Sequence, residues 1–210
     1  RDAAESLVIK HHYSHRMPSN IQFVATWHLP GGLFGDLGEP VAAIIFSIPP
    51  TRWRESVLEL SRLVRTPNVT RPLTGLIAFA VRKIKNADLL VSFADATFGH
   101  HGGVYQAASW NFSAFREPRM DGLLVNGSFI PGRSANSTYG TRSPTKLAER
   151  LNGQTVEAHM DSGKYLYWKA ISRSGKKKAE RLGLCRLAYP KPYDARANAV
   201  GCYDLAIEEI

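Results

Sequence analysis

The chain has 210 residues, of which 44% are hydrophobic and 21% charged, and a net charge of +9. This composition allows one sizeable core and excludes a largely disordered chain. The positive excess attracts polyanions, nucleic acid first, although it is also compatible with a merely basic soluble protein. No apolar run approaches the roughly 20 residues of a membrane span. Cys185 and Cys202 are too few for a disulfide framework, so we expect a cytoplasmic protein that contacts no membrane.

The first half of the chain predicts helix, three strands and helix. A short helix is expected over residues 2–10, with Asp2 as its N-cap. Strands are expected over 20–28, 41–48 and 57–64, with a Gly-rich turn at 31–38, and a helix over 73–86.

The second half predicts short elements separated by polar segments. They are a strand at 89–94, a helix at 103–110, a strand at 111–116, a hairpin at 123–130, a loop at 131–143, a helix at 144–151 capped by Ser143, a strand at 164–171 and a basic run at 173–181. This order indicates an α/β fold with a mixed sheet flanked by helices. We expect one main domain over 1–172, which includes a basic segment at 117–152, and a basic C-terminal extension over 173–210.

The segment between the strand at 89–94 and the helix at 103–110 carries the strongest signal for chemistry. Asp95 ends an apolar run, His100 and His101 follow, and Tyr105 lies on the first turns of the helix. Asp95 can act as a general base and Tyr105 as a general acid. The alternatives are a loop cap for Asp95 and a core position for Tyr105. Gly102 and Gly103 either admit a ligand close to the backbone or serve helix geometry alone.

A second cluster, His11-His12-Tyr13-Ser14-His15, holds three imidazoles in five residues. His11 and His15 have the i,i+4 spacing of metal ligands on a helix, and Asp95 would complete a set of two histidines and a carboxylate. Placement of a substrate base is the other interpretation. The residues favour neither.

The strand at 57–64 contains Glu59, Ser61 and Arg62. Regular alternation places Glu59 and Ser61 on one face and Arg62 on the other. A charged residue inside a central strand is either paired or functional. From residue 116 onward basic residues are frequent, interleaved with amides and hydroxyls, which suits contacts to phosphates and bases. The expected DNA-contacting residues are Arg133, Asn136, Tyr139, Arg142, Lys146, Lys176, Lys177 and Lys178.

Taken together, His12-Tyr13-Ser14, the run from Glu59 to Val64, Ser92-Phe93-Ala94-Asp95, Gly99-His100-His101-Gly102 and Tyr105-Gln106-Ala107 resemble the phage Mom family, over about residues 8–170. That resemblance implies modification of adenine N6 in phage DNA with a carbamoylmethyl group, which protects the DNA from restriction. It also implies a divergent member of the GNAT acyltransferase superfamily, with its central mixed sheet.

Several site assignments follow from the resemblance alone. GNAT proteins bind the acyl donor beside their fourth strand and the next helix, which implies donor contacts from Glu59, Ser61, Arg62, Leu63, Val64, Thr74 and Gly75. Tyr105 followed by Ser109-Trp110 is similar to the GNAT tyrosine motif and implies a general acid. The pyrophosphate loop is reduced to residues 68–75 with one glycine, which disfavours ordinary acetyl-CoA. An acyl-CoA or an aminoacyl donor such as glycyl-tRNA, and iron, are the cofactors that the family implies.

The favoured interpretation is a DNA adenine N6-modifying transferase that acts on double-stranded DNA. His12, Tyr13, Ser14, Asp95, His100 and Tyr105 are its expected catalytic residues. The amine of adenine is a poor nucleophile, so positioning and base assistance matter. The rivals are an N-acetyltransferase for a protein or small amine, a non-catalytic DNA-binding protein, and an iron oxygenase.

Overall fold

The computed structural model describes residues 1–31, 37–49, 53 and 55–191. The chain forms two compact units. The first comprises Arg1–Ala94, His100–Phe115 and the described chain from Tyr165 onward; the second comprises Asp95–Gly99 and Arg116–Lys164. Residues 173–191 of the predicted extension therefore belong to the first unit.

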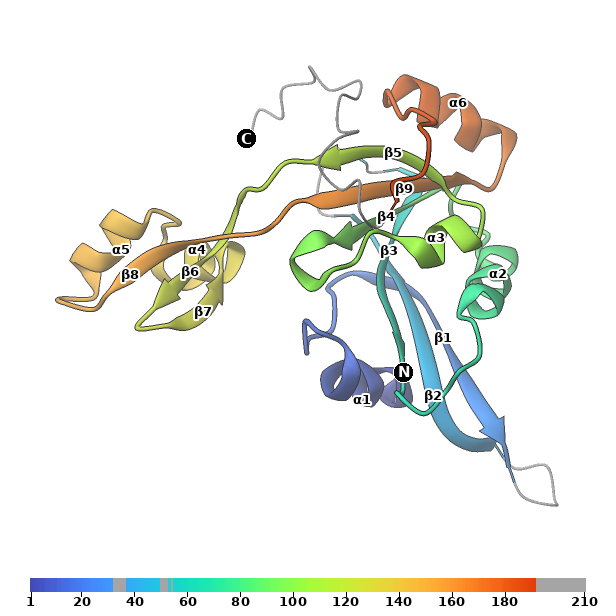
Figure 1. Cartoon of the computed structure of the whole chain (residues 1–210), viewed down its shortest axis with the longest axis horizontal. Coiled ribbons are helices and arrows are strands. Elements are labelled where there is room, and N and C mark those ends of the chain that lie inside the picture. Colours follow the sequence, from blue (N-terminus) through green and yellow to red (C-terminus); the bar gives the residue numbers. More distant parts are fainter. Residues whose placement is uncertain (32–36, 50–52, 54, 192–210) are drawn as a thin grey trace. The chain divides into compact units, whose positions relative to one another are not determined.

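A six-stranded mixed sheet forms the first unit (Figure 1). In sheet order its strands are β1 (Ile21–Pro30), β2 (Leu37–Ser47), β3 (Val57–Arg65), β4 (Leu89–Asp95), β9 (Lys164–Ala170) and β5 (Asn111–Arg116). β1, β2 and β3 pair antiparallel, whereas β3 and β4 pair parallel. The predicted α/β class with a mixed sheet is confirmed. Part of the Gly-rich turn expected at 31–38 lies outside the described residues.

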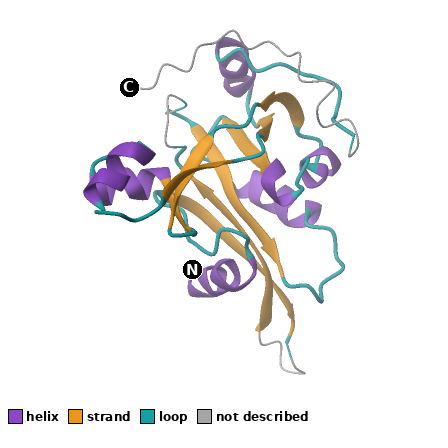
Figure 2. Ribbon diagram, turned by 60° about the vertical axis from the view of Figure 1, so that its left-hand side comes forward, coloured by secondary structure: helices purple, strands orange, loops and turns teal. Residues whose placement is uncertain are grey.

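Helices cover both sides of strands β1 to β3. The helices of this unit are α1 (Asp2–His11), α2 (Thr74–Lys83), α3 (Gly103–Ala107) and α6 (Arg173–Arg181). α1 packs Ala4, Leu7 and Val8 against Ala43, Ile45 and Val64 of the sheet. Figures 1 and 2 show α1 on one side of these strands and α2 on the other. Among the described residues, no helix is long and apolar enough to cross a bilayer.

A β-bulge interrupts β3 and changes which residues share a face. Ile45 pairs with Arg62 and the next residue of β2, Phe46, pairs with Leu60, so Ser61 is the extra residue. Because directly opposed residues share a face, Arg62 lies on the face of Ile45. Glu59 is opposite Ser47 and lies on that face too. The predicted separation of Glu59 from Arg62 is therefore wrong: both lie on the face that α1 covers.

The parallel pair β3–β4 is joined over a short length only. The ladder matches Val57, Leu58 and Glu59 with Leu89, Leu90 and Val91. Beyond it β3 continues to Arg65 and β4 to Asp95, and within these described strands no further pair is formed. At the first position past the ladder, the Ser92 hydroxyl donates to the Leu60 carbonyl at 2.9 Å. Ser92 thus replaces a lost ladder bond where the strands part.

The second unit is a three-stranded antiparallel sheet covered on one face by two helices. Its strands lie in the order β7 (Ser128–Pro131), β6 (Met120–Val125) and β8 (Val156–Met160), and its helices are α4 (Gly132–Tyr139), α5 (Pro144–Arg150) and the 3-10 turn η1 (Ala96–Phe98). Leu123, Val125, Ala135 and Leu147 form its core. The hairpin on Asn126-Gly127 and the helix capped by Ser143 are confirmed.

Several predicted elements are wrong. The loop expected at 131–143 contains α4, and β8 was missed. α3 ends at Ala107 rather than 110, because Ser109 takes φ 57° in the left-handed region. Asp2 lies in the first turn of α1 with Arg1 at the N-cap position, where no side chain caps the helix.

Candidate active site

A cluster of polar and aromatic side chains gathers on the α1 side of the first unit. α1 ends at His11, and His12 continues in extended conformation. The rings of His12 and Tyr13 lie 4.2 Å apart, and those of Tyr13 and His100 lie 5.6 Å apart, edge to face. Tyr13 is 36% exposed. Two motifs almost 90 positions apart in the sequence therefore meet, as their chemistry predicts.

Arg62 adds a fixed positive charge to this cluster. Its Nε donates to the Arg16 carbonyl at 2.9 Å and its Nη1 to the Ser61 carbonyl at 2.6 Å. Burial lowers the pKa of Arg62, while Tyr13 and Glu59 act in the opposite direction. The guanidinium stays charged, because arginine does not lose its proton in proteins. Bonds to two carbonyls hold it in place beside Tyr13 and Glu59.

The hydrogen bonds of His12 define its tautomer. Nδ1 accepts the backbone N–H of Ser14 at 3.1 Å and lies 2.9 Å from the Ser14 hydroxyl. A nitrogen that accepts an N–H carries no proton, so the proton of neutral His12 is on Nε2. No described residue bonds to Nε2. His12 therefore offers an N–H donor.

The surroundings of His12 keep it uncharged. Burial, followed by Arg62, His100 and His15, lowers its pKa to about 4. At neutral pH the imidazole is then neutral and holds its Nε2 proton. Neutral His12 can therefore donate a hydrogen bond that orients an acceptor atom of a substrate, but it provides no positive charge at neutral pH.

Tyr105 lies behind this cluster, in the core. It is 8% exposed, with ring centroids 5.6 Å from Trp110 and 5.2 Å from Tyr167. Its hydroxyl is 2.8 Å from that of Ser92. Burial raises the pKa of Tyr105 well above its usual value. Both interpretations of Tyr105, core tyrosine and phenol proton donor, remain compatible with this position.

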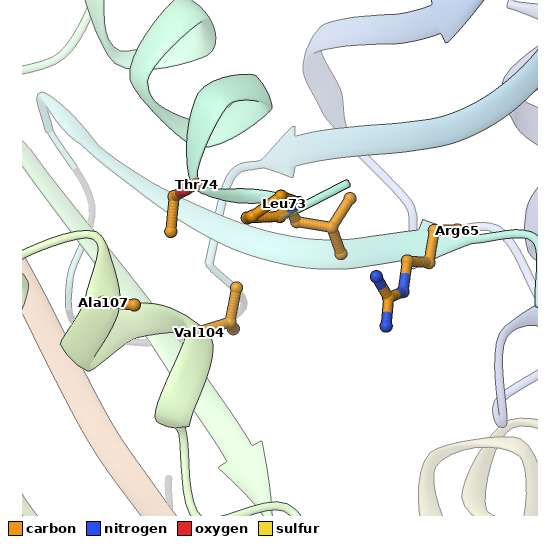
Figure 3. A pocket seen from close by; sticks show the side chains of 6 residues that line it. Arg65, Leu73, Thr74, Val104 and Ala107 are labelled. Carbon is orange, nitrogen blue, oxygen red and sulfur yellow. The ribbon is translucent and has the colours of Figure 1, made fainter. Parts of the chain in front are cut away.

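A cleft of about 270 Å³ opens between the start of α2 and α3 (Figure 3). Leu73 and Thr74 face Val104 and Ala107 across it, with Arg65 at one end. A second cavity, of about 510 Å³, continues along the two helices from Thr74 and Gly75 to Lys169. Apolar walls with a cation at each end suit a ligand that has an apolar stem and an anionic group.

The predicted donor-binding residues do not gather in one place. Thr74 and Gly75 line the cavities. Glu59 and Arg62 belong to the polar cluster, and Ser61 bonds to Ser47 at 2.5 Å in the bulge. Val64 is buried against α1. Leu63 is half-buried on the opposite face, opposed to Ile44.

Asp95 belongs to the second unit, where its carboxylate has two partners. One oxygen, Oδ1, accepts the N–H of Thr97 at 3.0 Å, and Oδ2 forms an ion pair with Lys164 at 3.0 Å. The side chain is 7% exposed. The loop cap considered for Asp95 is therefore present. Its role as a base stays a prediction.

The predicted DNA-contacting residues occur in both units. Arg133 and Asn136 are exposed on α4, and Lys146 is exposed on α5, while Tyr139 packs against the core of its unit. Arg142 is exposed between the two helices. Lys176 and Lys177 are exposed on α6, whereas Lys178 donates to the Glu55 carbonyl.

Metal ligation by the first histidine cluster is not supported by the geometry. His11 is the last residue of α1, and His15 lies beyond it with φ 43°. The helical i,i+4 relationship is therefore absent. Among the described residues no three His, Cys, Asp or Glu side chains gather as ligands would.

Sequence reasoning assigned no individual role to two residues that the structure places in buried hydrogen-bond networks. Ser92 is the single hydroxyl residue within the apolar strand β4, and this isolation was the available signal. Asp161 precedes Ser162-Gly163, a turn signal. Its carboxylate accepts the N–H groups of Arg119 and Gly163, each at 3.0 Å, and pairs with Arg116.

These features define a mixed α/β protein in which a polar cluster and an apolar cleft lie beside a splayed pair of parallel strands. The chain belongs to the Mom protein family, whose model matches residues 1–191. The expected family is confirmed. No curated protein matches the chain.

Among solved structures, the chain is similar to one from Desulfovibrio desulfuricans that is assigned to the GNAT family of acetyltransferases. The two share 12% sequence identity with a TM-score of 0.35, and the match covers 64% of each chain. The chain thus spans about 64% of the length of that protein.

Proposed function

We propose that the protein is a transferase that attaches a carbamoylmethyl group to adenine N6 in DNA and so protects phage DNA from restriction. The observation that carries the proposal is the polar cluster of His12, Tyr13, Arg62 and His100. It combines a neutral N–H donor, a fixed cation and an exposed phenol ring on one face of the sheet. Membership of the Mom family supports it.

The residues of the cluster match the needs of an extruded adenine. A base must leave the helix stack before its amine can react, at a cost of a few kcal/mol. Tyr13 and His100 offer ring faces on which it can stack. The Nε2 proton of His12 can bind a ring nitrogen of adenine, which holds the amine in one orientation. Asp95 would take the proton that N6 loses as the new bond forms.

The cleft between α2 and α3 is the place we assign to the group donor. Thr74, Gly75 and Val104 give it an apolar wall, and Arg65 and Lys169 lie at its ends. An acyl-CoA or a charged tRNA would each present an anionic group near an apolar or small one. Acyl transfer from a glycyl donor would break its thioester or ester bond and join the carbonyl carbon to N6, and Tyr105 would protonate the departing thiolate or ribose oxygen. The product of that step is the glycyl amide. A redox-neutral isomerisation that exchanges the two nitrogens between the carbonyl and the methylene carbon would then give the carbamoylmethyl group.

The charge distribution favours phosphate contacts from the first unit. The second unit has seven basic and six acidic residues, so nearly all of the net charge of +9 lies elsewhere. In the first unit α6 exposes Arg173, Lys176, Lys177 and Arg181. Such residues neutralise phosphates of double-stranded DNA.

The decisive experiment is mass spectrometry of nucleosides from DNA of cells that express the protein. We expect a new adenosine derivative, absent with His12→Ala and Arg62→Ala. A glycyl amide and a carbamoylmethyl amine on N6 are isomers, so fragmentation must locate the bond to the methylene carbon. Charge reversal at Lys176 and Lys177, which are exposed on α6 of the first unit, serves as the comparison: it weakens DNA binding without removing the cluster.

The rival functions give other results. A GNAT N-acetyltransferase would turn over acetyl-CoA in the absence of DNA. A non-catalytic DNA-binding protein would leave adenine unmodified and would retain its function in the His12→Ala variant. An unchanged nucleoside profile, with the protein folded and bound to DNA, contradicts the proposal.

A further inference from the structure

The open face of the second unit's sheet carries an unusual arrangement of rings. α4 and α5 cover the face that bears Leu123 and Val125. On the opposite face Phe129 is opposed to Leu124, and Gly122 to His159. Phe129 is 48% exposed, although it lies in the middle of a paired strand. Its ring is therefore presented to solvent.

Gly122 explains how the Phe129 ring is held. A Cβ at position 122 would lie 2.4 Å from the ring, so the phenyl group lies directly on the backbone there. The ring centroids of His159 and Phe129 lie 4.7 Å apart at an interplanar angle of 61°, and the Nδ1 of His159 is 2.7 Å from the Asp121 carboxylate. Gly122 and His159 thus hold the phenyl ring, while about half of the residue stays exposed.

The charges around this ring are ordered along the sheet. Arg119 and Arg133 are exposed and adjoin the end of the sheet at which Gly122 is opposed to Pro131. Glu157, opposed to Leu124, lies nearer the hairpin end. Asp121, next to Gly122 at the arginine end, lies 2.7 Å from the His159 ring. The two exposed arginines outnumber this carboxylate, so a phosphate is favoured at their end. A carboxylate at the other end can accept an exocyclic amine of a base.

We propose that this face binds an unpaired base of a DNA strand, which stacks on Phe129 while Arg119 and Arg133 contact the flanking phosphates. An exposed aromatic ring on an uncovered sheet is a common platform for unpaired bases. The inference rests on the proposed function, since extrusion of an adenine from a duplex leaves the opposing base without a partner. Its test does not require catalysis.

The full chain is titrated against a fluorescein-labelled single-stranded DNA of mixed sequence and against its duplex, with anisotropy as the readout. Phe129→Leu keeps an apolar cover on Gly122 and removes the aromatic face. We expect it to weaken single-strand binding by at least about five-fold, with duplex binding nearly unchanged. Phe129→Trp should bind at least as tightly as the native chain. Arg119→Gln and Arg133→Gln should reduce the salt dependence of binding.

Phe79→Leu is the matched control, because Phe79 is 42% exposed on α2 in the first unit. It should leave single-strand binding unchanged. Equal affinities of native and Phe129→Leu chains, or an equal loss with Phe79→Leu, overturn the proposal. So does tighter binding of RNA of the same sequence, or a concentration-dependent dimer that Phe129→Leu abolishes. If the native chain binds single-stranded DNA through Phe129 but does not modify adenine, the proposed function is contradicted and the further inference stands.

Discussion

The hydroxyl groups of Tyr105 and Ser92 lie 2.8 Å apart at the point where β3 and β4 separate. Ser92 also lies 2.9 Å from the Leu60 carbonyl, which can only accept. Ser92 has one hydrogen, so both contacts are satisfied when Ser92 donates to Leu60 and Tyr105 donates to Ser92. The phenol proton of Tyr105 is therefore the start of a chain of two hydrogen bonds that runs through Ser92 to the Leu60 carbonyl of β3.

We expect Tyr105→Phe and Ser92→Ala to have different effects. Tyr105→Phe removes one donor and should cost about 1 kcal/mol of stability. Ser92→Ala leaves the buried Leu60 carbonyl without a donor and should cost about 1–3 kcal/mol. If Tyr105 protonates the leaving group, Tyr105→Phe also lowers the modification rate by about 10²–10⁴. Ser92→Ala, which keeps the phenol, should lower the rate far less.

Urea denaturation and nucleoside analysis measure the two effects separately. A double-mutant cycle gives the coupling between the hydroxyl groups, which we expect to be at least about 0.5 kcal/mol because they are in contact. A Tyr105→Phe variant with full activity would reduce Tyr105 to a core residue.

His12 makes stability depend on pH. Its pKa is lowered to about 4 in the folded chain, against 6.5 as the ordinary value. Between these values the unfolded chain binds the proton and the folded chain does not, so stability rises with pH from about 4 to 6.5 and then levels off. The full difference is up to about 3 kcal/mol.

His12→Asn keeps an acceptor for the Ser14 N–H but does not titrate. We expect its unfolding free energy to change less over this pH range than that of the native chain, by up to about 3 kcal/mol. Denaturation at a series of pH values measures this difference. His11→Asn, at the end of α1, controls for the loss of a histidine. Parallel pH profiles of the native and His12→Asn chains would contradict the prediction.

Local patterns predicted the elements that have strong periodicity or a strong turn signal. The apolar run of β2, the helix α2 and the Asn126-Gly127 hairpin are of this kind. α4 was missed because Gly, Ser, Asn and Thr have poor helix propensity. It forms because Ala135 and Tyr139 pack on the core of their unit. Packing against residues that are distant in the sequence makes this segment helical, and a local sequence pattern cannot show such packing.

The residue types of the polar cluster were predictable, its geometry less so. His12, Tyr13 and His100 were expected at one site from their chemistry, whereas Arg62 was expected among the donor-binding residues; all four lie in one cluster. The shared face of Glu59 and Arg62 could not be predicted, because it depends on a bulge at Ser61 that only the pairing with β2 reveals. A one-residue change of register reverses the faces of a strand.

Asp161 ties together the two segments at which the second unit begins and ends. Its Oδ1 accepts from the N–H groups of Arg119 and Gly163, and its Oδ2 pairs with Arg116. Burial raises the pKa of Asp161, but these N–H groups and the guanidinium outweigh it and lower the pKa overall. Its contribution to stability is therefore present above the ordinary pKa of the carboxyl group and is lost as pH falls below it.

Asp161→Asn retains the Oδ1 acceptor and loses the ion pair, whereas Asp161→Ala loses every contact. We expect a cost of about 3 kcal/mol for Ala, and about half of that for Asn or for Arg116→Met. Hydrogen exchange of peptides from residues 116–164 is the measurement, since the loss should concentrate in that unit. If all three variants show the same hydrogen-exchange protection as the native chain, the carboxylate does not hold these segments together.

Asp95 is both a cap and the predicted base, and the two roles can be separated. Its Oδ1 accepts the N–H of Thr97, and its Oδ2 pairs with Lys164. Asp95→Asn preserves the accepting oxygen and removes the charge. If Asp95 takes the proton from N6, Asp95→Asn and Asp95→Ala should both lose modification by about 10²–10⁴ while DNA binding persists. If the residue is only a cap, Asn should remain active and Ala should lose about 1 kcal/mol of stability.

Lys164→Met provides the matched comparison for Asp95. It removes the cation and leaves the carboxylate, so a base at this position should retain activity in Lys164→Met, whereas Asp95→Asn should lose it. If the ion pair is only structural, both variants should stay active and lose stability. The measurement is the initial rate of adenine modification, taken with the anisotropy of bound duplex DNA. A fully active Asp95→Asn enzyme would assign proton removal to another group.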